Sequence, residues 1–197
     1  MTWRNDPTPV VFRRAVTRIR SWRPRSHMRV SELPAPRFLA PYSHGISATV
    51  GLQDTQATEA HLVLLHDPQG QPSWEGVFRL VTYVGTHTDE PWQSIGYWQT
   101  QMWVNLTEAL HARGAAYRAA GGTVTCTSSQ SCGGLATDET ARDGKANLSA
   151  AYNGSHSGTQ IQLRASWTPP DCEVSHHLDA WESLIMLASR VAGTRYQ

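Results

Sequence analysis

The stretch TQIQLRASWT, residues 159–168, alternates polar and apolar side chains with a period of two. Its apolar residues are Ile161, Leu163, Ala165 and Trp167, and the residues between them are polar or charged. Successive side chains of a β-strand point to opposite faces of the sheet, so this pattern predicts a strand that is buried on one face only. The fold is therefore expected to contain a sheet with one face in water.

A second strand is expected just upstream, at residues 123–128. The two strands are separated by residues 130–158, which are rich in Gly, Ser, Asn, Ala and Thr and contain almost no large apolar side chain. Such a segment buries too little apolar surface to offset the entropy of ordering it. We expect it to be a mobile loop.

Another pair of strands is predicted at residues 61–66 and 76–84, which are short runs rich in apolar, β-branched and aromatic residues. The sequence DPQG at residues 67–70, between them, has the composition of a turn. These two strands are therefore expected to lie next to each other and to run antiparallel.

Apolar residues recur at helical spacing in four segments of the chain. The predicted helices cover residues 9–23, 41–50, 99–120 and 175–192. Pro9 suits the first turn of the N-terminal helix, and Pro24 ends that helix. The pair Gly121-Gly122 is expected to close the third helix.

The predicted elements follow the order α-α-β-β-α-β-β-α. Two hairpins separated by a helix favour an α+β fold, with an antiparallel sheet of at least four strands and helices mainly on one face. A chain of 197 residues with 40% apolar content suits one domain. We therefore expect a single domain over residues 1–197, with a basic amphipathic N-terminal helix within residues 1–30 and the mobile loop at 130–158.

Cysteine content and hydropathy indicate where the protein works. The three cysteines, Cys126, Cys132 and Cys172, cannot all pair with one another, and no secretory apolar segment precedes them. We therefore expect free thiols in the cytoplasm. No apolar run approaches the roughly 20 residues that a membrane-spanning helix needs, which argues against integral membrane insertion.

The predicted N-terminal helix has a basic face, formed by Arg13, Arg14, Arg18 and Arg20, and an apolar face opposite to it. Three interpretations are open: the helix docks on its own domain, lies on an anionic membrane, or contacts nucleic acid. We expect docking on the domain, because the apolar face needs cover. The basic face, as we name these four arginines, then remains available to a partner.

Eight short segments spread along the chain carry a family resemblance. They are FRRAV (12–16), LPAPRFLAPY (33–42), LLHDP (64–68), WEGVFRLVTYV (74–84), LTEAL (106–110), GGTVT (121–125), LRASWTP (163–169) and HLDAW (177–181). Together they resemble an uncharacterised actinobacterial family of about this length, from which the chain departs at residues 92–101 and in the loop at 130–158. The resemblance implies no activity, because the family has none assigned.

No group of residues has the spacing of a metal site or of a catalytic motif. The His and Cys clusters are His176-His177, His61 with His66, and Cys126 with Cys132. None has the close paired spacing of a structural zinc site. A Gly-x-Ser-x-Gly elbow and a phosphate-binding Gly-rich loop are also missing. We therefore assign no catalytic, cofactor-binding or metal-binding residue.

The sharpest candidate for an anion or partner site is a set of polar and aromatic residues. They are His66, Asp67, Trp74, Glu75, Arg79 and Arg164. Arg79 lies in a predicted apolar strand, so its charge is expected either to pair with an acidic side chain or to bind a ligand. In one interpretation, Arg79 or Arg164 forms a structural ion pair with Glu75 or Asp67 beneath the ring of Trp74. We expect Arg79 to be paired in this way. In the other, the two arginines receive a carboxylate or phosphate beside Trp74, with His66 as a proton donor.

These observations favour a non-catalytic intracellular binding or regulatory module that engages an acidic partner, either a protein or RNA, and uses no cofactor. The alternative is a small-ligand binder or enzyme with an anion-accepting pocket at Trp74, Glu75, Arg79 and Arg164. A third class, a structural subunit of an assembly, would expose an apolar patch around Trp92, Trp98 and Trp103. The sequence leaves the oligomeric state and the partner's identity open.

Overall fold

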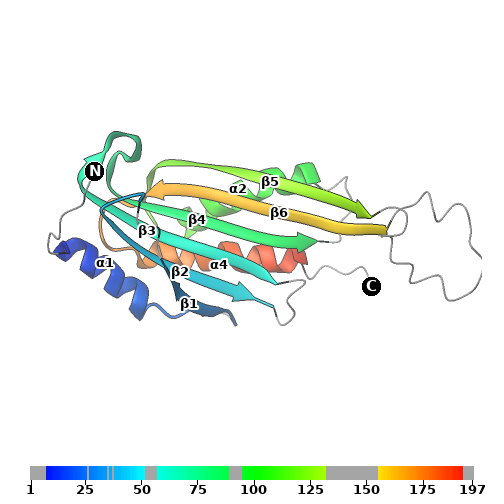
Figure 1. Ribbon diagram of the computed structural model, residues 1–197, viewed down its shortest axis with the longest axis horizontal. Helices are drawn as coiled ribbons and strands as arrows, with labels where there is room; N and C mark the ends of the chain where they lie inside the picture. The colour runs from blue at the N-terminus through cyan, green and yellow to red at the C-terminus, as the bar shows by residue number, and fades with distance from the viewer. Residues whose placement is uncertain are drawn as a thin grey trace, which may run out of the picture.

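The computed structural model describes residues 8–25, 27–34, 36, 38–51, 57–88, 95–131 and 155–192. These residues form a six-stranded sheet in the order β1-β2-β3-β4-β6-β5, and every neighbouring pair is antiparallel (Figure 1). The strands are β1 (Arg29–Leu33), β2 (Tyr42–Val50), β3 (Thr58–Gln71), β4 (Gly76–Thr88), β5 (Arg118–Ser131) and β6 (Ser155–Thr168). The predicted α+β class with an antiparallel sheet is confirmed.

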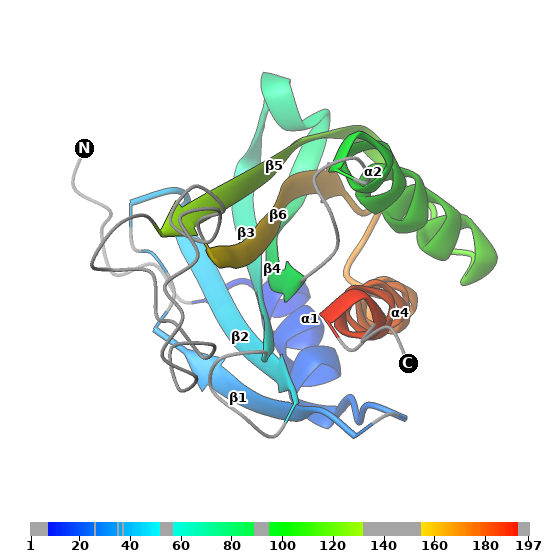
Figure 2. The same ribbon diagram turned by 90° about the vertical axis from the view of Figure 1, so that its right-hand side faces the viewer.

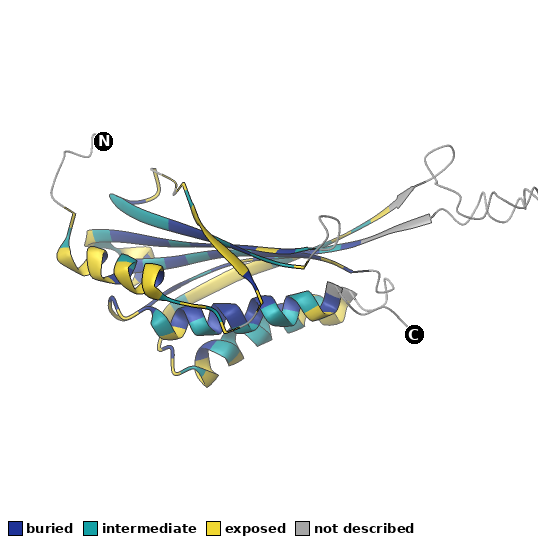
Figure 3. Ribbon diagram, turned by 90° about the horizontal axis from the view of Figure 1, so that it is seen from below, coloured by how far each residue is buried: buried dark blue, intermediate teal, exposed yellow. Residues whose placement is uncertain are grey.

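Helices cover one face of this sheet, as Figure 2 and Figure 3 show from two sides. They are α1 (Val10–Ser21), α2 (Ile95–Ala112) and α4 (Ser175–Ala192), and a short 3-10 turn, η1 (Pro72–Trp74), joins β3 to β4. α4 packs on the middle of the sheet, α2 lies beside it against β5 and β6, and α1 lies on its other side. None of the described helices combines the length and apolar character needed to cross a membrane.

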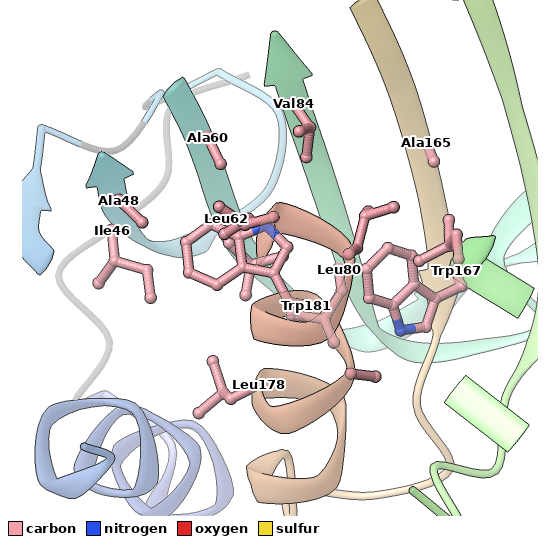
Figure 4. Packing of buried hydrophobic residues seen from close by; sticks show 14 of the residues in the cluster. Ile46, Ala48, Ala60, Leu62, Leu80, Val84, Ala165, Trp167, Leu178 and Trp181 are labelled. Atoms are coloured by element: carbon pink, nitrogen blue, oxygen red, sulfur yellow. The ribbon is translucent and has the colours of Figure 1, made fainter. Parts of the chain in front are cut away.

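The layer between the sheet and the helices is filled by alternate residues of β2, β3, β4 and β6, by two half-buried residues of β5, and by one face of each helix. Figure 4 shows the part of this layer around Trp181. On β6, Ile161, Leu163, Ala165 and Trp167 are all buried, as the alternation in the sequence predicts. Trp181 of α4 lies in the middle of this layer with no exposed surface. The strand that predicted a one-sided sheet is therefore part of its core.

Hydrogen bonds fix the two fully buried indoles within this apolar layer. Trp181 Nε1 donates to Thr82 Oγ1 at 2.9 Å, and Trp167 Nε1 donates to His177 Nδ1 at 3.1 Å. A buried N–H group without a partner would cost roughly 1–3 kcal/mol, so each bond strongly favours one position of the indole. Because each bond joins α4 to a strand, together they set the position of α4 along the sheet.

Residues 42–50 form strand β2, so the helix predicted at residues 41–50 is wrong. Tyr42, Ile46 and Val50 recur every four residues, which fits a helix, but the same spacing also fits a strand. Ala48 distinguishes a strand from a helix here. It lies two residues after Ile46, and both side chains are buried, as expected for alternate residues of a strand. With β1, which the sequence analysis did not identify as a strand, β2 extends the sheet to six strands.

The helix predicted to reach residue 120 already ends at Ala112. Gly114 adopts a φ of +64°, and its N–H donates to the carbonyl oxygen of His111 at 3.0 Å. A glycine in the left-handed region is a common way to end a helix, because it has no Cβ to clash. The early stop leaves residues 118–131 free to form β5.

Gly121-Gly122 therefore does not close a helix but lies within β5, where it faces Ser166 and Ala165 of β6. A Cβ at position 122 would lie 2.6 Å from the carbonyl oxygen of Arg164, which is too close for any other residue. The prediction from the glycine pair is wrong for this reason: Gly122 permits a close approach of two strands.

The remaining predicted elements agree with the structure. The last helix is α4 over the same residues, 175–192, and the two predicted hairpins are β3 with β4 and β5 with β6. All four strands are longer than predicted. The predicted mobile loop at 130–158 falls mainly on residues 132–154, which lie outside the described residues.

Helix α1 docks on its own domain, which is the arrangement expected from its apolar face. Phe12, Ala15 and Ile19 are buried against the core. At the end of the helix, Trp22 packs on Trp181 with ring centroids 6.2 Å apart, and its Nε1 donates to Asp179 Oδ1 at 3.0 Å. α1 is therefore held on the domain at both ends.

The docking of α1 can be tested with Phe12→Ala. We expect this variant to lower the free energy of unfolding by about 3 kcal/mol, because a buried aromatic side chain is removed. Val11→Ala, at an exposed neighbouring position, is the matched control and should change it by less than about 0.5 kcal/mol. Denaturant unfolding measures both, and equal stability of the two variants would mean that α1 does not contribute to the core.

Candidate functional site

The six residues of the candidate anion site lie on opposite faces of the sheet. Arg79 and Arg164 alternate with buried residues of β4 and β6, so they point away from the helices. His66 is buried on the helix side, where its ring lies 5.9 Å from that of Phe12. The set therefore does not form one site, and His66 cannot donate a proton to an anion held by the two arginines.

Arg79 is held by three neutral oxygen atoms. Its Nη1 donates to the carbonyl oxygen of Ala119 at 2.7 Å and to Thr168 Oγ1 at 3.2 Å, and its Nη2 donates to Ser166 Oγ at 2.7 Å. Within the described residues no carboxylate forms a salt bridge with it, so the expected ion pair is wrong. Burial lowers the pKa of Arg79, and the charge of Glu75 partly opposes this effect.

Trp74 belongs to a small apolar cluster on the helix-free face of the sheet. It is 8% exposed and packs with Ala40 and Leu65, which are also buried. Its carbonyl oxygen accepts a hydrogen bond from Thr168 Oγ1 at 2.6 Å. Trp74 therefore covers part of the sheet instead of forming the wall of an open pocket.

Glu75 and Asp67 shape the connection between β3 and β4. Glu75 adopts a φ of +55°, and its carbonyl oxygen accepts a hydrogen bond from Arg118 Nη1 at 3.4 Å. The carboxylate of Asp67 accepts one from the Gln69 N–H at 3.0 Å and another from Gln71 Nε2 at 3.3 Å. The backbone of Glu75 and the carboxylate of Asp67 therefore have local structural contacts, and neither carboxylate forms a salt bridge with an arginine among the described residues.

Arg164 is exposed, in contrast to the half-buried Arg79. Its guanidinium lies over the ring of Tyr83, 5.7 Å from the centroid, and its Nη2 donates to Gln162 Oε1 at 3.1 Å. The ring of Tyr83 also contacts His61, with centroids 5.7 Å apart. This part of the helix-free face is polar and holds one cation against a flat aromatic surface.

His66 is buried in a stack of aromatic rings beneath α1. Its ring lies 4.4 Å from that of Phe78, and its Nδ1 is 2.9 Å from the carbonyl oxygen of Val77, to which it donates. Its Nε2 is buried and has no partner in the described part of the chain. Burial lowers the pKa of His66, although the Val77 carbonyl and the charge of Asp67 oppose it.

His177 is a second buried histidine, and the fold keeps it neutral. Its Nδ1 accepts the indole N–H of Trp167, so this nitrogen must keep its lone pair. Burial, and then the charge of His176, lower the pKa of His177 to about 4, against a smaller opposing effect of Asp171. Among the residues that the structure describes, no three His, Cys, Asp or Glu side chains are grouped so that they could hold a metal ion.

The basic face of α1 is exposed along the helix at Arg13, Arg14, Arg18 and Arg20. Arg18 pairs with Glu173 at 3.0 Å, and Arg20 pairs with Glu32 at 2.8 Å. The guanidinium groups of Arg13 and Arg14 have no hydrogen bond or ion pair within the described segments. The first two turns of α1 therefore carry two cations that no side chain among the described residues neutralises.

A shallow pocket of about 270 Å³ lies beside α4, and the sequence did not predict it. It is lined by Arg25, Arg113, Glu182, Ser183, Met186, Leu187 and Arg190. Arg113 Nη2 donates to Ser183 Oγ at 3.0 Å, and the backbone N–H of Arg25 donates to Glu182 Oε1 at 2.8 Å. These residues come from three separate segments of the chain, so no local pattern in the sequence could have indicated the pocket.

In the described part of the chain, the tryptophans considered as an assembly surface do not form an exposed patch. Trp98 and Trp103 of α2 are half-buried and pack against the core. Trp92 lies outside the described residues. Trp98 and Trp103 alone therefore do not supply the exposed apolar patch that a structural subunit was expected to show.

Comparison with known proteins gives a family but no function. The model of a family described as "Protein of unknown function (DUF3000)" matches residues 8–194. No curated protein and no solved structure shows significant similarity to the chain.

The structural role of Arg79 predicts a measurable loss of stability. Arg79→Met keeps much of the apolar stem but removes three hydrogen bonds, and hydrogen bonds to charged groups contribute roughly 1.5–3 kcal/mol. We expect the free energy of unfolding in urea to fall by about 2 kcal/mol. Arg164→Met, at an exposed position, should change it by less than about 0.5 kcal/mol. If both variants are as stable as the parent, Arg79 is free to act as a ligand site.

The buried histidines predict that acid destabilises the fold. His177 has an ordinary pKa of 6.5 when unfolded and about 4 when folded, so below pH 6.5 only the unfolded state takes up the proton. The free energy of unfolding should fall by about 3 kcal/mol from this group as the pH drops from 6.5 to 4. His177→Asn keeps an acceptor for Trp167, and its stability should decline less steeply over this range. An unchanged slope would mean that His177 is protonated in the fold.

Proposed function

Given that the chain belongs to the DUF3000 family, whose members are described as proteins of unknown function, we propose that it is a non-catalytic binding module for an acidic partner. The partner binds on the outer side of α1, at Arg13 and Arg14, and the module works in the cytoplasm. The domain is a scaffold that fixes this helix in place.

The observation that carries this proposal is that the guanidinium groups of Arg13 and Arg14 are accessible to a partner. Both are exposed and unpaired in the described part of the chain, and they follow each other on a helix whose opposite face is buried. A fixed helix loses little entropy when its side chains bind, which favours recognition. Arginine also matches carboxylate and phosphate groups with two parallel hydrogen bonds.

An acidic protein segment fits this surface better than RNA. Val10 is 60% exposed and Val11 is 43% exposed, so apolar side chains lie directly before the two arginines. A surface that mixes exposed apolar groups with arginine suits a protein partner. Single-stranded RNA is usually held by exposed aromatic rings, whereas Phe12 of α1 is buried and Trp22 just after it is half-buried.

An anion pocket on the sheet has weaker support. Three of the candidate groups are engaged in the fold: the guanidinium of Arg79 by oxygen atoms, the ring of Trp74 by an apolar cluster, and His66 by the stack beneath α1. Of the two candidate arginines only Arg164 is exposed, and it lies over Tyr83. One cation without converging partners gives little affinity for a small anion.

The proposal is tested with a double charge reversal, Arg13→Glu with Arg14→Glu. Binding is measured by fluorescence anisotropy with two probes of matched length, a glutamate-rich peptide and a single-stranded RNA, at increasing salt. We expect the parent to bind the peptide with an affinity that falls as salt rises, because exposed charges are screened. The double variant should lose at least about tenfold in affinity, or about 1.4 kcal/mol.

The matched control is Arg118→Glu with Arg164→Glu, which changes the net charge equally on β5 and β6, away from α1. This control should bind the peptide as well as the parent does. Equal losses in both double variants would show a response to net charge alone, and the site on α1 would be wrong. Tighter binding of RNA than of the peptide would replace the protein partner with RNA.

A further inference from the structure

The two edges of the sheet are built very differently. β1 has five residues, includes the charged Arg29 and Glu32, and is tied to α1 through the ion pair between Glu32 and Arg20. β5 has fourteen residues, and from Ala119 to Ser131 it contains no charge and no proline. Natural sheets protect their edges with short strands, charges, prolines or bulges. β1 has such protection, whereas the sequence of β5 has little.

The middle of β5 is a regular strand with an open outer side. From Gly121 to Ser128 each residue is paired in register with β6, and the irregularities lie at the two ends of this stretch. No strand in the described part of the chain pairs with its other side. Along this edge, the backbone N–H and C=O groups that point outward can therefore accept another strand.

We infer that β5 pairs with β5 of a second copy of the chain, antiparallel and about a twofold axis at Thr125. This register sets Thr123 opposite Thr127 of the second copy, and Thr125 opposite its own counterpart. A twofold axis requires that a surface complements itself, and an uncharged strand brings no like charges together. Facing threonines are favourable cross-strand pairs.

The opposite face of the strand supports the same register. Val124 and Cys126 alternate with the threonines, are half-buried, and pack against the core on the helix side. A twofold axis at Thr125 sets Val124 of one copy opposite Cys126 of the other. The two apolar side chains thus cover each other, and the threonines stay on the polar face. A shift of the axis by one residue in either direction would pair Val124 or Cys126 with a small or polar residue.

Helix α2 adds surface to this contact. It packs against β5 and β6 on the helix side of the sheet (Figure 2). Its Tyr97 is 60% exposed, and Trp103 and Val104 are half-buried. Joining two sheets at β5 brings the α2 helices of both copies to the same face of one continuous twelve-stranded sheet.

The test compares the parent with Thr125→Lys by sedimentation velocity, from low micromolar to the highest soluble concentration. Thr125 is exposed and faces Gln162 in its own sheet, so lysine fits the monomer, but two lysines meet at the twofold axis. We expect a concentration-dependent dimer for the parent and a monomer for the variant. Ser31→Lys, on the edge strand β1, is the matched control and should remain a dimer.

Mixing two variants tests the register itself. Thr125→Lys and Thr125→Glu should each be monomeric alone, and their mixture should form a dimer again because opposite charges then face each other. A parent that stays monomeric, or a Thr125→Lys variant that dimerises like the parent, would overturn the inference. Loss of the dimer in Ser31→Lys alone would assign the contact to β1 and overturn it as well.

Chemical cross-linking tests whether residue 125 of one copy lies close to residue 125 of the other. In a background with Cys126→Ser and Cys132→Ser, Thr125→Cys should cross-link to its counterpart with a short bifunctional maleimide. Ser31→Cys in the same background should not. Cross-linking through residue 31 and not through residue 125 would contradict pairing at β5.

Discussion

The indole of Trp181 is fully buried between α4 and the sheet, and its Nε1 donates to Thr82 Oγ1 at 2.9 Å. Thr82 donates in turn to the carbonyl oxygen of His61 on β3 at 2.9 Å. α4, β4 and β3 are thereby joined at the centre by linked hydrogen bonds in an apolar layer, where an unpaired group is costly. Trp22 packs on the same indole, so the position of α1 depends on it too.

This arrangement leaves most of the unusual polar residues with structural roles. Arg79 joins β4 to β5 and β6, and His177 accepts the N–H of Trp167. His66 supports the rings beneath α1. A charged or titratable residue in an apolar context predicts either a site or a buried network. Here the hydrogen-bond partners favour the network, whereas Arg13 and Arg14, on the outer side of α1, have no partner among the described residues.

The sequence could predict those elements whose pattern has only one interpretation. Residues 159–168 alternate cleanly and α4 keeps one apolar face, so α4 was predicted with both bounds and β6 with its end, although β6 begins four residues earlier, at Ser155. β2 was misassigned because Tyr42, Ile46 and Val50 satisfy a helical and a strand period alike. The partners of Arg79 could not be predicted, because they depend on how β5 and β6 pair, including a register shift between Arg118 and Gly121.

The central claim is that the acidic partner is recognised on α1 and not on the helix-free face of the sheet that carries Arg79 and Arg164. It is tested most directly by NMR of the arginine side-chain Nε–H groups while a glutamate-rich peptide is added to the full chain. The account predicts that the resonances of Arg13 and Arg14 shift in proportion to binding, while those of Arg79 and Arg164 stay in place. Shifts at Arg79 and Arg164, with none at Arg13 and Arg14, would contradict it.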